Sequence, residues 1–114
     1  MKIEAHVDRG AKVIAVGETR LDAALAVEFK DHLRDMIADA DGRVILDLGQ
    51  VTCGDSSGLG AIVAGMKMTG KVGGLELSAL QPNVLRVFQL TRMDSVFPIH
   101  ANLDQALEGG SLAS

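Results

Sequence analysis

The sequence contains no tryptophan or tyrosine, only three phenylalanines, and a single cysteine among its 114 residues. Without Trp and Tyr it lacks the flat side chains on which sugars and nucleic-acid bases usually stack. One cysteine cannot form an internal disulfide or a cysteine-based zinc site. No apolar run approaches the roughly 20 residues of a membrane span, and the charged residues within 1–10 exclude the apolar centre of a signal peptide. We therefore expect a cytoplasmic protein.

The charge balance is mildly acidic. Lys and Arg number 11 against 15 Asp and Glu, which gives a net charge of −4. Such a balance is a poor match for a protein that binds nucleic acid or an anionic membrane. The hydrophobic share of 47% is enough for a packed core, and the length suits one domain over residues 1–114.

The first half of the chain predicts a hairpin, a helix and a central strand. Apolar residues alternate with polar ones over residues 3–7, and residues 12–16 form a second apolar stretch after a turn. A helical period begins after Asp22, a suitable N-cap, and Gly42 ends the segment. Residues 44–48 are almost continuously apolar, as in a strand that is covered on both faces.

The second half alternates helices and strands. We expect a helix that starts near Ser57 and stops at Gly70, a strand over residues 75–77, and a helix that begins at Pro82. A last strand is predicted over residues 96–99.

Pro98 cannot donate a hydrogen bond to a neighbouring strand, so the last strand should lie at an edge of the sheet. Asn102 can cap a terminal helix. The predicted order is β, β, α, β, α, β, α, β, α. This order indicates an α/β fold: a small mixed sheet with an N-terminal hairpin, followed by parallel βαβ units with helices packed on the sheet.

The segment of residues 51–60, VTCGDSSGLG, joins the predicted central strand to the next helix. In open α/β sheets, ligands and partners bind outside the carboxyl ends of the strands. A helix N-terminus also carries unpaired N–H groups and a partial positive charge, which favour an anion such as a phosphoryl group on a serine. Ser56 and Ser57 lie at this position.

The sequence resembles the anti-sigma factor antagonist family, which consists of STAS domains. The resemblance rests on residues 46–48 (LDL) followed by residues 55–60 (DSSGLG), in register with the predicted element order over nearly the whole chain. Residues 21–22, 73–74 and 82–84 also stand at the family's expected places. In the family, the second serine of the motif is phosphorylated by an anti-sigma factor that is itself a serine kinase.

The resemblance implies that Ser57 is the phosphorylation site. The unphosphorylated protein would bind the kinase and release the sigma factor, and a serine phosphatase would reset the phosphorylated form. Neighbouring residues map onto the partner-binding surface: Asp22, Asp55, Ser56, Gly58, Leu59 and Gly60. The same resemblance implies no catalytic residue, no cofactor and no bound metal.

Other interpretations remain open at this point. Ser56 or Ser57 could cap the helix, because serine is a preferred N-cap residue. The chain could also be a constitutive STAS interaction module, such as a lipid-transport accessory subunit or a stress-signalling scaffold. Residues 54–58 match G-x-S-x-G, so a serine hydrolase using Ser56, Asp94 and His100 is a further alternative.

Overall fold

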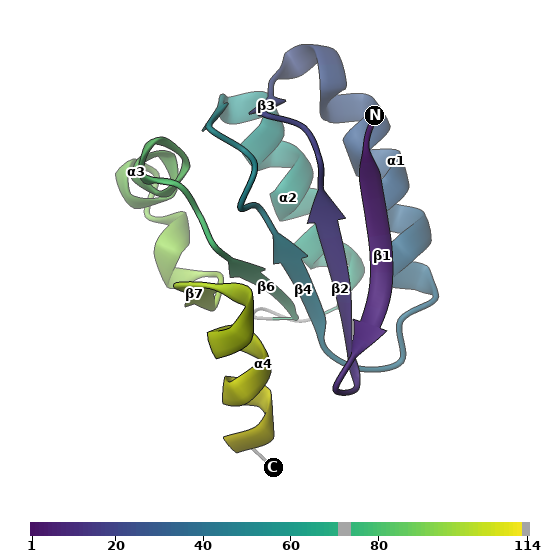
Figure 1. Ribbon diagram of the computed structural model, residues 1–114. Coiled ribbons are helices and arrows are strands. Elements are labelled where there is room, and N and C mark those ends of the chain that lie inside the picture. The colour runs from purple at the N-terminus through teal and green to yellow at the C-terminus, as the bar shows by residue number, and fades with distance from the viewer. Residues whose placement is uncertain (71–73, 113–114) are drawn as a thin grey trace.

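The computed structural model of the chain describes residues 1–70 and 74–112 and shows a five-stranded sheet with helices on both faces (Figure 1). Gly73, one of the positions in the family comparison, lies outside the described residues. The strands are β1 (Ile3–Asp8), β2 (Ala11–Val16), β3 (Arg20–Leu21), β4 (Val44–Asp47), β5 (Cys53–Gly54), β6 (Leu75–Ser78) and β7 (Ile99–His100). The helices are α1 (Ala23–Ala38), α2 (Ser56–Met68), α3 (Pro82–Leu90) and α4 (Leu103–Leu112), with a short 3₁₀ turn at Met93–Ser95.

The main sheet has the strand order β1-β2-β4-β6-β7. β1 pairs antiparallel with β2, and each of the other pairs is parallel. The hairpin turn uses left-handed backbone at Arg9 and Gly10, with φ of 52° and 79°. The sequence-based prediction of a mixed sheet with an antiparallel margin is confirmed.

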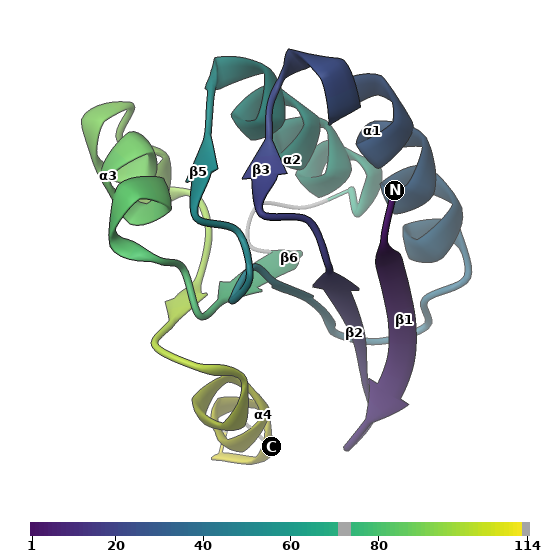
Figure 2. The same ribbon diagram turned by 45° about the horizontal axis from the view of Figure 1, so that its top comes forward.

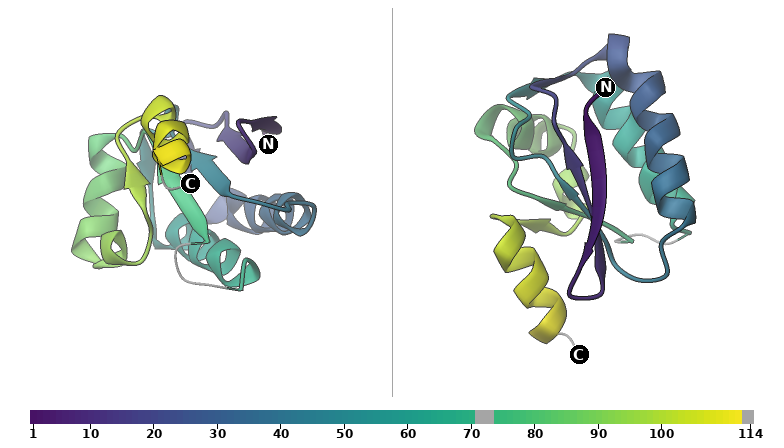
Figure 3. Two further views of the ribbon diagram at one scale, coloured as in Figure 1. Left: turned by 90° about the horizontal axis from the view of Figure 1, so that it is seen from below. Right: turned by 45° about the vertical axis from the view of Figure 1, so that its right-hand side comes forward.

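The helices divide between the two faces of the sheet. Figure 3 shows α1 and α2 on one side and α4 on the other. Within the central strand β4, Leu46 belongs to the large core under α1 and α2, and its neighbour Ile45 packs with Ala106 and Leu107 of α4. Alternate residues of one strand therefore enter two different cores, as the almost continuous apolar run predicted.

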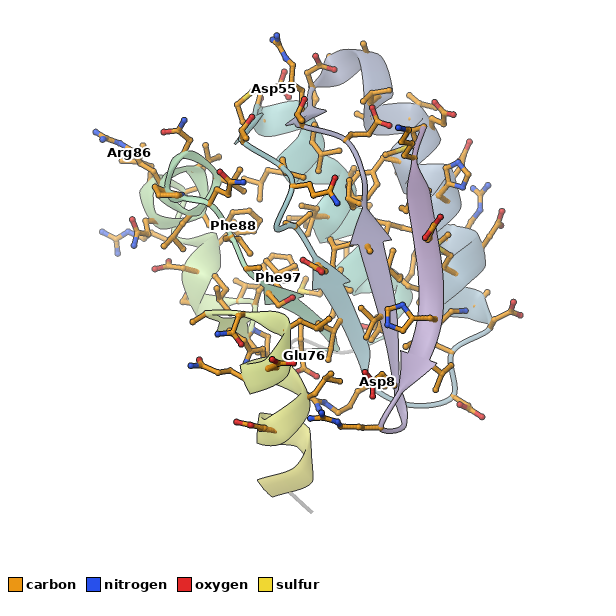
Figure 4. The ribbon with its side chains drawn as sticks, viewed as in Figure 1. Asp8, Asp55, Glu76, Arg86, Phe88 and Phe97 are labelled. Atoms are coloured by element: carbon orange, nitrogen blue, oxygen red, sulfur yellow. The ribbon has the colours of Figure 1, made fainter. Side chains whose placement is uncertain are left out.

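The strand predicted over residues 96–99 is wrong in extent, because β7 contains only Ile99 and His100. Phe97 is buried instead, with its ring edge against Phe88 of α3 at 5.8 Å between centroids and an interplanar angle of 79° (Figure 4). The Pro98 carbonyl accepts a hydrogen bond from the Leu77 N–H at 2.8 Å. β7 lies at the sheet edge, as predicted from the missing N–H of this proline.

Capping residues and glycines set several helix ends where the sequence predicts them. Asp22 caps α1 by accepting from the Ala24 N–H at 3.1 Å, and Asn102 accepts from the Gln105 N–H at 2.9 Å at the start of α4. Gly70 follows α2 with a φ of 77°. The end of α1 differs from the prediction, because the helix stops at Ala38, before Gly42.

Candidate functional site

Two very short strands hold the first turns of α1 and α2 side by side. β3 pairs in parallel with β5, with Arg20 opposite Cys53 and Leu21 opposite Gly54. The pairing continues in the Asp55 N–H, which donates to the Leu21 carbonyl at 3.2 Å. Because each strand leads directly into a helix, both helices begin at the same end of the molecule (Figure 2).

Asp55 is the N-cap of α2. Its carboxylate accepts from the Ser57 N–H at 2.9 Å and from the Gly58 N–H at 3.2 Å (Figure 4). The alternative in which a serine caps this helix is therefore wrong. The extended backbone of Asp55 lets its side chain reach back over the first turn, so that both serines become the first residues of the helix.

The hydroxyl of Ser57 is available at the surface. Both Ser56 and Ser57 are exposed, and neither hydroxyl bonds to any residue that the structure describes. Ser57 also lines a shallow groove between α1 and α2, whereas Ser56 does not line it. The other groove residues are Ala26, Val27 and Lys30 of α1 and Gly60, Ala61 and Ala64 of α2. Phosphorylation of Ser57 requires no opening of the fold.

The two glycines that follow Ser57 have different structural roles. A Cβ on Gly58 would come within 2.4 Å of the Leu21 carbonyl oxygen, whereas a Cβ on Gly60 would meet nothing within 4 Å. Gly58 is buried, and Gly60 is exposed. Gly58 therefore allows α2 to approach the backbone of β3 closely.

The remaining residues of the predicted partner surface cluster at the same end. Asp55, Ser56 and Gly60 are exposed, while Asp22 and Leu59 are half-buried. Leu59 contributes to a small apolar hollow between α2 and α3 that also includes Val84, Val87 and Phe88. The fold thus brings the predicted site residues together, and whether they contact a partner stays a prediction.

Sequence reasoning missed the contribution of α1 to this surface. Val27 is an apolar residue with 69% of its surface exposed, and Lys30 lies on the same side of the groove. The only signal in the sequence was one valine among the charged residues on the outer side of an amphipathic helix. The position of that side next to Ser57 depends on how α1 and α2 pack.

His100 takes part in a cluster with Glu76 and Arg43. Its Nε2 lies 2.9 Å from Glu76 Oε1, and Arg43 donates two hydrogen bonds to the same carboxylate at 2.8 and 2.5 Å. Burial raises the pKa of Glu76, but hydrogen bonds from Arg43 and His100 outweigh it, so the pKa is lowered below its usual value. Among the described residues, no hydrogen bond joins Ser56, Asp94 and His100 into a triad.

None of the helices in residues 1–70 and 74–112 is both long and apolar enough to cross a membrane. Within the same ranges, His, Cys, Asp and Glu side chains form no group of three that could hold a metal ion.

Comparison with known proteins gives one family. Residues 2–106 match the family model described as the STAS domain. The Bordetella bronchiseptica protein BtrV, named as an anti-sigma factor antagonist, is 31% identical over 88 residues, which cover 76% of each chain. An anti-sigma factor antagonist from Mycobacterium paratuberculosis is 27% identical, with a TM-score of 0.85 over 95% of this chain and 92% of that one.

The anti-sigma factor antagonist SpoIIAA has solved structures in two states that also resemble this chain. The unphosphorylated form gives a TM-score of 0.76 over 96% of each chain, at 22% identity. The phosphorylated Bacillus form gives 0.67 over 94% of this chain and 97% of that one, again at 22% identity. Identity at this level shows a shared fold.

Proposed function

Because the chain belongs to the STAS domain family, we propose that it is an anti-sigma factor antagonist that is switched by phosphorylation of Ser57. In this proposal the unphosphorylated protein binds an anti-sigma factor serine kinase and releases the sigma factor. The observation that carries it is the hydroxyl of Ser57 at the first turn of α2, which is exposed and has no hydrogen-bond partner among the described residues, while Asp55 already serves as the cap. The similarity to anti-sigma factor antagonists supports the class of partner.

The modification itself is a phosphoryl transfer. Ser57 Oγ would attack the γ-phosphorus of ATP held by the kinase, the bond to ADP would break, and the hydroxyl proton would pass to the kinase. A serine phosphatase would reverse the state by hydrolysis. The chain would thus be the substrate of two enzymes in the cytoplasm and would catalyse no reaction itself.

Electrostatic repulsion can supply a switch of sufficient size. A phosphoryl group adds about −1.5 to −2 charges at pH 7. If one negative charge of the partner lies about 4 Å away, at an effective dielectric constant of about 20, each unit of added charge costs about 4 kcal/mol. That cost corresponds to nearly a thousandfold loss of affinity. Asp55, the N-cap directly before the first turn of α2, already places a negative charge near Ser57 before modification.

The contact surface in this proposal surrounds Ser57. Five residues would touch the partner directly, because each has exposed surface at this end of the molecule: Asp22, Asp55, Ser56, Leu59 and Gly60. The buried Gly58 would contribute by holding α2 against β3.

The test is a binding and phosphorylation assay with a purified anti-sigma factor serine kinase from the same organism. Wild-type protein should gain the mass of one phosphate with ATP and then dissociate from the kinase. Ser57→Ala should stay bound with or without ATP. Ser56→Ala is the matched control, and it should be phosphorylated and released like the wild type.

Two outcomes would contradict the proposal. Phosphate transfer that persists in Ser57→Ala and disappears in Ser56→Ala would show that Ser56, and not Ser57, is the phosphorylated residue. Equal binding of the unmodified and the phosphorylated protein would instead support a constitutive interaction module. Ser57→Asp should bind more weakly than wild type, although one carboxylate carries less charge than a phosphate.

A further inference from the structure

We propose that Lys30 is the counter-ion of the phosphorylated Ser57, so that the phosphate forms an ion pair across the groove between α1 and α2. The inference rests on the proposed function only in taking Ser57 as the modified residue. It assigns a contact with the phosphate to a residue of α1, which lies outside the family motif.

Two backbone donors at the first turn of α2 are already occupied. The N–H groups of Ser57 and Gly58 already donate to the Asp55 carboxylate. A phosphoryl group on Ser57 would therefore lie beside a carboxylate that occupies two of the helix's N-terminal donors. A cation from another element is needed to balance this concentration of negative charge.

Arg20 and Lys30 are candidate cations for balancing the phosphate charge. Arg20 lies 3.8 Å from the Asp22 carboxylate and is already engaged there. Lys30 is exposed, lines the same groove as Ser57, and makes no ion pair or hydrogen bond with any described residue. Lys30 is therefore a charge on the same groove as Ser57 that no described residue already pairs.

The relative direction of α1 and α2 allows Lys30 to approach a phosphate on Ser57. α1 and α2 run side by side in the same direction from the β3–β5 end (Figures 1 and 2). Lys30 is about two turns into α1, and side chains on a helix lean toward its N-terminus. A long side chain at position 30 can therefore reach along the groove toward the first turn of α2. There a phosphoryl group, which projects beyond the serine oxygen, can meet it.

This ion pair has a consequence for the switch. In the unmodified protein Lys30 is a positive charge beside the exposed Val27 on the groove. In the phosphorylated protein the same charge is neutralised, and the phosphate lies over the groove. Modification would then remove an attractive group as well as add a repulsive one.

The experiment measures the second pKa of the phosphate by ³¹P NMR in the full-length protein. Phosphoserine is introduced at position 57 during synthesis, so no kinase is required. Lys30→Met should raise this pKa, normally near 6, by about 0.3 to 0.7 units, which is the range of an exposed ion pair. Lys30→Arg should keep the wild-type value, because it retains the charge.

Lys67→Met is the matched control. Lys67 is an exposed lysine in the last turn of α2, about 15 Å along the helix from Ser57 and beyond the screening length of about 8 Å at physiological salt. It should change the phosphate pKa by less than about 0.1 units. In high salt the difference between Lys30→Met and wild type should shrink.

Equal pKa changes in Lys30→Met and Lys67→Met would overturn the ion pair, as would no change in Lys30→Met. Either result would leave the proposal that a kinase phosphorylates Ser57 unaffected, because the phosphoserine in this experiment is introduced during synthesis. Conversely, a kinase that does not phosphorylate Ser57 would overturn the proposed function without changing the pKa of the phosphate measured by ³¹P NMR.

Discussion

Replacing Gly58 by alanine should destabilise the protein, although alanine is the better helix former. In an unobstructed helix interior the change from glycine to alanine stabilises by about 1 kcal/mol. At position 58 the new Cβ would come within 2.4 Å of the Leu21 carbonyl oxygen, an atom of the backbone that no rotamer change can move. Either α2 or β3 must shift, and overpacking of this kind costs typically about 1–3 kcal/mol or more.

The matched variant is Gly60→Ala on the same helix, where the added Cβ has open space. We expect Gly58→Ala to lower the free energy of unfolding by up to about 2 kcal/mol after the propensity gain is subtracted. Gly60→Ala should raise it by about 1 kcal/mol. Urea denaturation followed by circular dichroism measures both free energies. In thermal denaturation the midpoint temperatures of the two variants should move in opposite directions by about 4 °C per kcal/mol. A Gly58→Ala protein as stable as Gly60→Ala would refute the close approach of α2 to β3.

Two other changes test local features. Asp55→Ala should lower the free energy of unfolding by about 1–2 kcal/mol. The loss should exceed that of Asp22→Ala, because Asp55 accepts two backbone hydrogen bonds and Asp22 accepts one. Equal losses of the two variants in urea titrations would contradict this ranking. Glu76→Gln should cost about 1–3 kcal/mol at pH 7, because Arg43 and His100 lose a charged acceptor. The lowered pKa of Glu76 means that its contribution is complete above its unfolded pKa of about 4.5 and is lost as the pH falls through the folded pKa. The stability difference between wild type and Glu76→Gln, measured from pH 7 down to pH 3, should therefore narrow below about pH 4.5, and a constant difference would contradict the assignment.

Much of the candidate site could be predicted from the sequence because its signals are local. Asp55, Ser56 and Ser57 are consecutive residues, and their place between an apolar strand and an amphipathic helix follows from the residue pattern. The choice of cap could not be predicted, because aspartate and serine are similarly good caps and one residue of shift exchanges their roles.

The sequence by itself determined the order of the main elements, the antiparallel hairpin, the parallel strands and the edge position of the last strand. These features depend on periodicity, proline and glycine within short windows. Only the tertiary structure decided the β3–β5 pairing, the close contact of Gly58 with Leu21 and the placement of Lys30 and Ser57 on one groove. Each of these joins residues that are roughly 30 positions apart, and a strand of two residues has no period of its own, so its existence depends on the partner that packing brings to it.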